Sequence, residues 1–320
     1  MEISRRDFIT TTVAGSLALA GTGVAASAEA QQSPGGTTSA GPRPIIVSAG
    51  NGFEYLDAAY GFLKIALPLF PDASRHFQML LLLIALASIL YGSAMAFTQT
   101  NVRLVAGYSS VAQLGFITAG IFALSADASD GAVLQMVNHG LVVAPLFVIV
   151  AILAERSGTE DLREMGGMAM SAPILAALFL IVTLATLAMP GSANFIGEFY
   201  ILNGLFDAKI VFAIVAISGV AMSAYYALRL YQRTMHNTRP EGLESREIGL
   251  RDGLVLAPLV LCILGLALYP QLILERTAPT VGQTVARVRG GEAPEARLAK
   301  MTDKELRELI SATPAPGRRP

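Results

Sequence analysis

The sequence predicts an all-α fold, a polytopic transmembrane helix bundle with a broken helix, preceded by a signal peptide and a linker. First, 53% of the 320 residues are hydrophobic and only 15% are charged, whereas soluble domains carry about 25% charged residues. Second, several apolar runs approach the length of about 20 residues that a helix needs to cross a bilayer. Third, Pro190 and Gly191 interrupt one of these runs, and proline inside a helix removes a hydrogen-bond donor and clashes with the preceding turn.

The membrane domain is expected to cover residues 61–274. The fourth of its helices should break at Pro190. The chain turns polar from Gln271, so we expect residues 275–320 to form a polar tail with a short amphipathic helix over 303–311, begun by the capping-box pair Thr302 and Glu305. Six membrane helices are predicted from the apolar runs, over residues 77–97, 103–124, 132–153, 173–206, 209–231 and 254–269.

The first 60 residues differ from the membrane domain. Residues 1–30 are interpreted as a twin-arginine-type signal peptide, because an arginine pair, an apolar stretch and a small-x-small cleavage site follow in order. The alternative is an ordinary basic amino terminus. Residues 31–60 are interpreted as a linker and a short non-membrane segment, since 31–44 are rich in Gly, Pro, Ser and Thr. We expect residues 1–45 not to pack into the bundle.

The segments PIIVSAGNG (residues 44–52) and YLDAAYGFL (residues 55–63) resemble the start of exported asparaginases of the amino-terminal-nucleophile class. The resemblance covers fewer than about twenty residues, and the motif of a catalytic threonine does not follow. No hydrolase activity is assigned.

Composition limits the function classes. The net charge of −1 gives no indication of a nucleic-acid partner. The single cysteine, Cys262, cannot form an internal disulfide, a zinc finger or an iron–sulfur cluster. With three scattered histidines and no glycine-rich nucleotide fingerprint, no cofactor is expected in this chain, and any redox cofactor should lie elsewhere.

An acidic residue, Glu198, lies seven residues after Gly191 within this apolar setting. An ionisable residue in a bilayer is costly and marks a functional site by default. Broken backbone at membrane depth is tolerated only where protein buries it or where it lines a wet cavity. The combination indicates an ion or proton path. The alternative is a proline-kinked helix whose Glu198 faces water at one end.

Basic residues sort the loops between the predicted spans. If the broken segment crosses the membrane once, one side carries most of the arginines, and an excess of Lys and Arg marks the cytoplasmic side. The arginines on that side are Arg103, Arg156, Arg163, Arg233, Arg239 and Arg246.

Three motifs, in this order, resemble one family. They are QTNVRLVAGYSSVAQLGF (residues 99–116), GAVLQMVNHGL (131–141) and MPGSANFIGEF (189–199). They look like the carboxy-terminal half of the antiporter-like membrane subunits of bacterial NADH–quinone oxidoreductase, respiratory complex I, in particular a subunit M-like half. The resemblance covers roughly residues 60–274. It implies two inverted repeats of transmembrane helices, no bound redox centre, and proton movement coupled to quinone reduction elsewhere in the complex.

The resemblance assigns Glu198, His139 and Arg103 to a proton pathway. It makes Glu198 the buried glutamate of the family's second broken helix and His139 its intramembrane histidine. An apolar environment can poise a carboxyl group to exchange protons, and histidine titrates near neutrality. We therefore expect both side chains to point into the bundle. The alternative for His139 is a neutral histidine hydrogen-bonded across helices.

The chain also departs from the family pattern. Arg103 stands where the family has a lysine, and arginine keeps its proton, so it is either a fixed charge or an anchor at the membrane interface. Gln113 replaces a histidine of the family and does not titrate. Leu56 aligns with the family's lysine of the first broken helix, and the helices that precede it in the family have no counterpart here.

The expected function is that of a proton-translocating membrane subunit of NADH–quinone oxidoreductase, truncated or chimeric. Its partners would be the other membrane subunits of complex I, the lipid bilayer and protons, and its location the inner (plasma) membrane as a multi-pass protein. It would have no catalytic site of its own. The alternatives are a subunit of a multisubunit sodium/proton antiporter and a non-functional membrane fragment. Neighbouring genes would discriminate the complex I function from the antiporter function.

Overall fold

The computed structural model describes residues 59–236, 238 and 246–290, which all lie within one compact unit, residues 45–320. The predicted signal peptide, the asparaginase-like segment up to residue 58 and the predicted helix over 303–311 fall outside the described residues. The predictions for those segments therefore stay predictions.

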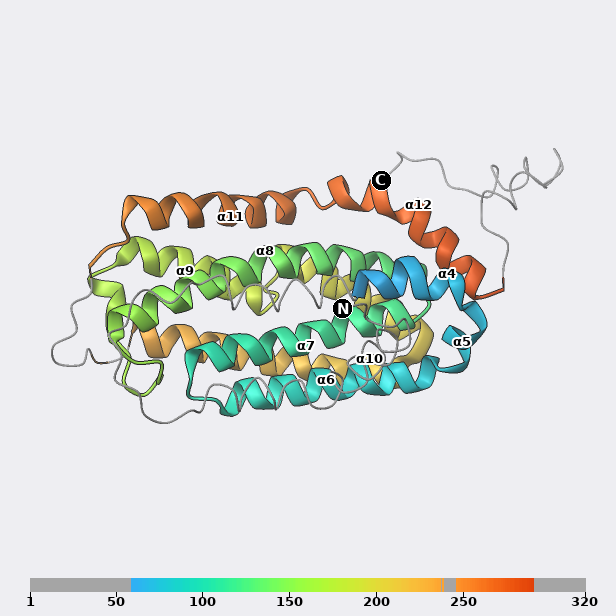
Figure 1. The fold of residues 1–320 in the computed structure, drawn as a ribbon, viewed down its shortest axis with the longest axis horizontal. Helices are drawn as coiled ribbons and strands as arrows, with labels where there is room; N and C mark the ends of the chain where they lie inside the picture. Colours follow the sequence, from blue (N-terminus) through green and yellow to red (C-terminus); the bar gives the residue numbers. More distant parts are fainter. Residues whose placement is uncertain (1–58, 237, 239–245, 291–320) are drawn as a thin grey trace, which may run out of the picture. The chain divides into compact units, whose positions relative to one another are not determined.

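The described part of the chain is helical, and the all-α prediction is confirmed (Figure 1). Five of its helices, α6, α7, α8, α10 and α11, are long and apolar enough to cross a membrane, and α9 is a shorter apolar helix. The elements are η1 (Phe62–Ala66), α4 (Leu67–Leu69), α5 (Pro71–His76), α6 (Gln78–Thr98), α7 (Val102–Phe122), α8 (Ala126–Ser157), η2 (Met168–Met170), α9 (Pro173–Thr186), α10 (Ala193–Met235), α11 (Leu250–Leu268) and α12 (Gln271–Val288).

The predicted break at Pro190 is present. Helix α9 ends at Thr186 and α10 begins at Ala193, so six residues without helical structure separate them. The interruption contains two residues with positive φ, Ala188 at 53° and Gly191 at 97°. Glycine adopts this backbone region at low cost because it has no Cβ, which explains why glycine follows the proline here.

Helix α10 is two helices in one, because its backbone is non-helical at Lys209, with φ −152° and ψ 74°. Before Lys209, Gly197 lies against Gln135 and Gly204 lies against Ala128, so this first half runs antiparallel to α8. The boundary at Lys209 coincides with the predicted start of the fifth span.

The second half of α10 runs the other way. Gly219 lies against Ile89, and Arg229 donates a hydrogen bond to the carbonyl of Phe97, so this half is parallel to α6. Helices α6 and α8 are each antiparallel to α7, and the two halves of α10 are therefore antiparallel to each other. The rings of Phe179 and Tyr231 are in contact, so α9 lies beside the last turns of the second half. The first half of α10 begins near the middle of α8 and continues to the opposite end of the bundle. The broken segment, α9 with the first half of α10, therefore passes through the bundle once.

Helices α11 and α12 lie along one face of the bundle over α8 (Figure 1). The predicted boundary at residue 274 is corrected by α12, which runs from Gln271 to Val288 across it. Val281, Val285 and Val288 of α12 are buried in the same core cluster as the first turns of α8. Their spacing places them on one face of a helix. The polar residues between them made the segment look like a polar tail in the sequence.

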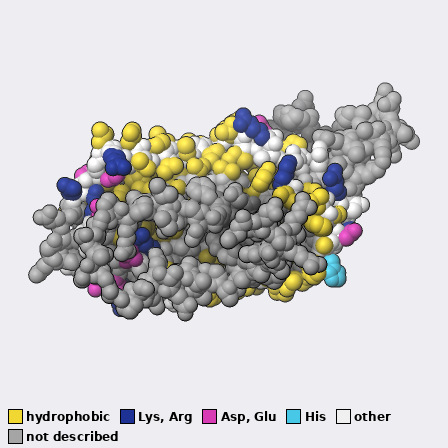
Figure 2. Space-filling model, in the orientation of Figure 1, with side chains coloured by type: hydrophobic (Ala, Val, Ile, Leu, Met, Phe, Trp, Pro, Cys, Tyr) yellow, Lys and Arg dark blue, Asp and Glu magenta, His cyan; other side chains and the backbone are white. Residues whose placement is uncertain are grey.

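Large apolar side chains are exposed on α6, on the second half of α10 and on α11. Outside the grey region, Figure 2 shows a largely hydrophobic surface, with charged side chains toward its left and right and one further group near the middle of the upper edge. This distribution is typical of surfaces that face lipid or neighbouring subunits.

The arginine-rich loops meet at one end of the bundle. Arg103 forms an ion pair with Glu160, and Arg156 donates a hydrogen bond to the carbonyl of Arg246. The Glu247 carboxylate accepts hydrogen bonds from the N–H groups of the first turn of α9 at 2.8 and 3.1 Å. Because the first helical N–H groups have no partner within their own helix, Glu247 caps the broken segment from a distant loop.

The close approach of the first half of α10 to α8 generates a stability prediction. A Cβ on Gly204 would collide with the backbone of Ala128, whereas a Cβ on Gly107 of α7 meets nothing within 4 Å. Gly204→Ala should lower the free energy of unfolding by about 1–3 kcal/mol through overpacking. Gly107→Ala, the matched control, should be neutral or slightly stabilising, because alanine is the better helix former. The apparent melting temperatures of the two purified full-length variants in detergent measure this difference in stability. A Gly204→Ala protein as stable as the control would contradict the close approach of α10 to α8.

The Glu247 cap generates a pH prediction. Burial opposes the charge of the Glu247 carboxyl, but hydrogen bonds from the N–H groups of Ile174, Ile248 and Leu175 and the nearby Arg156 guanidinium lower its pKa below the ordinary value of 4.5. A depressed folded-state pKa adds stability above the unfolded pKa, and this stability is lost as the pH falls through the folded pKa.

Glu247→Gln should therefore destabilise the chain by about 1 kcal/mol at neutral pH. Its difference from the wild type should shrink once the pH falls below 4.5. Thermal unfolding of the full chain in detergent from neutral pH to about pH 3 measures this difference, with Glu275→Gln on the exposed side of α12 as control. A difference that does not change with pH would show that the carboxylate charge is not what holds α9.

Candidate functional site

Glu198 lies in the second turn of α10, directly after the break. Helix α10 can begin here because the Ser192 side chain caps it, its Oγ accepting a hydrogen bond from the N–H of Phe195 at 3.3 Å. The side chain of Glu198 is turned into the bundle, and the residue is only 3% exposed. None of the ion pairs in the described part of the chain involves it.

One glutamine side chain holds the Glu198 carboxylate, and a second glutamine holds the first. Gln113 of α7 donates from Nε2 to Glu198 Oε1 at 2.6 Å, and Gln135 of α8 donates from Nε2 to Gln113 Oε1 at 2.8 Å. A carboxylate only accepts, so the Gln113 amide must turn its NH₂ group toward Glu198 and leave its oxygen free for Gln135. Three helices are thus joined by one chain of hydrogen bonds with a single direction.

His139 lies on α8 one turn beyond Gln135 and is 6% exposed. It makes no hydrogen bond to the described residues. Its neighbour Asn138 donates from Nδ2 to the carbonyl oxygen of Ala193 at 2.7 Å, which ties α8 to the first residue of α10. The structure therefore brings His139 to the same interior face as Glu198, as expected for residues that avoid lipid.

Arg103 is not brought to this site. It lies in the first turn of α7, ten residues before Gln113, a separation of about 15 Å along the helix axis. Its Nε lies 2.7 Å from Glu160 Oε1, and both side chains are more than a third exposed. The contact is an ion pair and not an aligned hydrogen bond. Of the three residues that the sequence assigns to one pathway, Glu198 and His139 lie in the interior of the bundle. Arg103 lies at one of its ends.

Several buried polar atoms on the helices of the site have no hydrogen-bond partner among the residues that the structure describes. Leaving such an atom unpaired is costly, so each requires an explanation, and an internal water is the usual one. These residues were missed at the level of sequence. Asn194 could have been found, because it lies four residues before Glu198 on the same helix face; the others have no local signal. The atoms are Gln135 Oε1, Asn138 Oδ1, both side-chain atoms of Asn194, Thr183 Oγ1 and Tyr226 OH.

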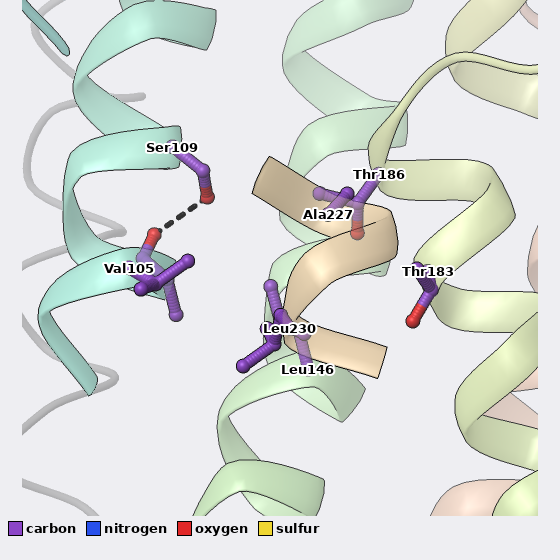
Figure 3. Close-up of a pocket in the computed structure, with 8 residues that line it drawn as sticks. Val105, Ser109, Leu146, Thr183, Thr186, Ala227 and Leu230 are labelled. Carbon is purple, nitrogen blue, oxygen red and sulfur yellow. Dashed lines mark hydrogen bonds between the residues drawn. The ribbon is translucent and has the colours of Figure 1, made fainter. Parts of the chain in front are cut away.

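A small cavity lies beside the break (Figure 3). Its volume of about 10 Å³ is close to the minimum for one water molecule. Two hydroxyl groups come from the last turns of α9 and one from Ser109 of α7, which precedes Gln113 by one turn. The cavity is lined by Val105, Ala106, Ser109, Leu146, Thr183, Thr186, Ala227 and Leu230.

The chemistry of this arrangement is that of a single carboxyl group held by neutral partners. The amides of Gln113 and Gln135 do not titrate, and no cation pairs with Glu198 among the described residues. Such a group can take up or release one proton without breaking an ion pair. In the described residues no group of three or more His, Cys, Asp or Glu side chains is arranged to hold a metal ion.

Comparison with known proteins gives consistent matches. A family profile described as NADH:quinone oxidoreductase/Mrp antiporter, TM, matches residues 56–223. NADH-quinone oxidoreductase subunit M from Rickettsia prowazekii is 37% identical over 217 residues, 67% of this chain and 44% of the relative. Subunit M from Escherichia coli K12 is 38% identical over 228 residues, 70% of this chain and 45% of the relative.

Solved structures share the fold. A chain of respiratory complex I from Thermus thermophilus with bound NADH matches with a TM-score of 0.71 and 29% identity, over 76% of this chain and 52% of that chain. A chain of the Mrp complex from Dietzia sp. DQ12-45-1b matches with a TM-score of 0.67 and 19% identity, over 75% of this chain and 53% of that chain, which shows the fold alone.

The chain spans less than half the length of the curated relatives it matches. The matched profile covers more than half of this chain and includes Arg103, Gln113, His139 and Glu198. Five helices fit to cross a membrane make the chain a multi-pass membrane protein. The chain belongs to the membrane-subunit family that NADH:quinone oxidoreductases and Mrp antiporters share.

Proposed function

We propose that this chain is a proton-translocating membrane subunit of an NADH–quinone oxidoreductase of the inner membrane, in which Glu198 is the principal proton-exchanging group. The relatives with 37 and 38% identity are subunit M proteins of that enzyme. The observation that carries the proposal is the carboxylate of Glu198, buried directly after a broken helix and held by the Gln113 amide.

Burial is what suits Glu198 to this role. In an apolar interior the neutral form of a carboxyl group is favoured over the charged form. The hydrogen bond from Gln113 acts in the opposite sense, because an amide N–H stabilises the carboxylate. The broken backbone before Ala193 and the cavity at the end of α9 provide places that water can occupy. Burial favours the neutral acid and the Gln113 hydrogen bond favours the carboxylate, so Glu198 can take up a proton from water on one side of the membrane and release it toward the other.

His139 is proposed as the next titratable relay, and Arg103 as a fixed charge at the end of the bundle. His139 lies one turn from Gln135 on α8, the helix that carries the last amide of the hydrogen-bond chain from Glu198, and this nearness supports the proposal. Arg103 keeps its proton under all ordinary conditions. Its ion pair with Glu160 suits it to holding the loop after α8 against the start of α7.

The proposed partners are the other membrane subunits of complex I, the surrounding lipid and protons. A redox cofactor is proposed to lie in another subunit. A second candidate function is that of a subunit of a multisubunit sodium/proton antiporter, because the family profile covers the Mrp antiporters and the Mrp complex of Dietzia shares the fold. The buried carboxylate fits both functions, so the test must separate them.

Replacement of Glu198 by Gln tests the site. Gln has the shape of Glu and still accepts a hydrogen bond, but it does not titrate. In membranes whose NADH–quinone oxidoreductase contains this chain, Glu198→Gln should lower proton pumping by roughly a hundredfold or to background. NADH oxidation with an artificial electron acceptor, which needs only the peripheral arm, should survive. Glu275→Gln, on the exposed side of α12, is the matched control. Undiminished pumping in the Glu198→Gln protein would refute the assignment.

The identity of the partners is tested by purification. The full chain carrying an affinity tag should bring down other membrane subunits of complex I from mild detergent, because its exposed apolar faces on α6 and α10 fit neighbouring subunits. Co-purification with sodium/proton antiporter subunits, together with sodium-driven proton exchange in vesicles, would favour the second candidate and contradict the first.

A further inference from the structure

We infer that Tyr226 is a positioning residue for Glu198, holding its carboxyl group through one bridging water that the cavity at the end of α9 supplies. This inference rests on the proposed role of Glu198 and adds a residue that neither the motifs nor the matched segment, residues 56–223, includes.

Tyr226 is a large side chain with an unexplained polar end. The residue is 1% exposed, and its hydroxyl has no hydrogen-bond partner in the described part of the chain. Buried tyrosines usually find a partner for this group. An apolar phenylalanine would fill the same core space without that cost, so the hydroxyl requires a function or a water.

The reversal of the chain at Lys209 brings Tyr226 to Glu198. The two residues lie in opposite halves of α10, which run antiparallel to each other. On the second half of α10, Gly219 contacts Phe116 of α7. Since this half is antiparallel to α7, two turns onward along α10 correspond to two turns back along α7. Tyr226 therefore lies near the level of Ser109, one turn from Gln113.

The cavity is next to Tyr226 along α10, although Tyr226 itself is not one of its lining residues. Ala227, the next residue, lines it together with Leu230, one turn beyond Tyr226 on the same helix face. Across from them, Thr183 of α9 presents a buried hydroxyl that is also without a partner. Figure 3 shows Thr183, Ala227 and Leu230 around this space. A water there would have the unsatisfied Thr183 hydroxyl as one partner, and the inference makes the Tyr226 hydroxyl its second, since a bound internal water needs at least two polar partners.

The chemistry favours a hydroxyl at this position. The Gln113 NH₂ group can donate to the ionised carboxylate or to the carbonyl oxygen of the neutral acid, but it cannot accept from the acid O–H. A tyrosine hydroxyl and a water can each donate or accept. Together they can donate to the ionised carboxylate and, after it takes up a proton, donate to its carbonyl oxygen or accept from its O–H. Tyr226 and the water thus provide the acceptor for the neutral acid that the Gln113 NH₂ group lacks.

The test reads the Glu198 carboxyl directly. The full chain is placed in lipid nanodiscs, and infrared difference spectra between wild type and Glu198→Gln, recorded as the pH is lowered until the acid band appears, isolate the carbonyl stretch of protonated Glu198. Tyr226→Phe should move this band to higher wavenumber, because the carbonyl loses a hydrogen bond. Tyr225→Phe, the exposed neighbour that stacks on Phe97, should leave it in place.

A second variant covers the case in which Tyr226→Phe does not fold. Thr183→Val keeps the shape of the side chain and removes the unsatisfied hydroxyl that lines the cavity, and it should slow hydrogen–deuterium exchange of the Glu198 acid. An unchanged band in a folded Tyr226→Phe protein, or unchanged exchange in Thr183→Val, overturns the inference. This readout does not use pumping. If Glu198→Gln still pumps while Tyr226→Phe shifts the band, the proposed function fails and the positioning role stands.

Discussion

The hydrogen bond between Gln113 and Glu198 is the contact on which the interior of this protein depends. It spans 2.6 Å between α7 and α10, and Gln135 extends it to α8 at 2.8 Å. A lone carboxylate buried in an apolar interior would be costly, so the two amides are what allow Glu198 to be there. Because both amides are neutral, the site is held in place without an ion pair that would fix its charge.

The backbone places this carboxylate by two departures from regular helix. The interruption between Thr186 and Ala193 ends α9 in the middle of the bundle, and the reversal at Lys209 returns the chain along α6. Glu198 therefore lies on a short helix that has other protein on several sides. Glycines at the contacts with α8, such as Gly197 and Gly204, allow the approach, since a Cβ at either would collide with α8.

The sequence predicted the fold class, the break at Pro190 and the helix boundaries well, because proline and long apolar runs act locally. It also indicated Glu198 and His139, since a charged or titratable residue in an apolar run is conspicuous. It could not show that the second half of α10 returns Tyr226 toward the level of Gln113, which depends on the reversal at Lys209, or that α12 packs on the core, because its buried valines are separated by polar residues. The resemblance assigned Arg103 to the proton pathway as a fixed charge, with an anchor at the membrane interface as the alternative; the structure places it at the start of α7, at an end of the bundle, in an ion pair with Glu160.

The central claim is that Glu198 takes up and releases a proton inside the membrane. A hydrophobic carbodiimide reacts with protonated carboxyl groups in apolar surroundings, so labelling of the full chain in membranes, followed by mass spectrometry of the peptide that contains Glu198, tests this most directly. The account predicts an adduct on Glu198 that decreases as the pH is raised, with little labelling of exposed carboxylates such as Glu275. Labelling confined to carboxylates at the ends of the bundle, with Glu198 unmodified at every pH, would contradict it.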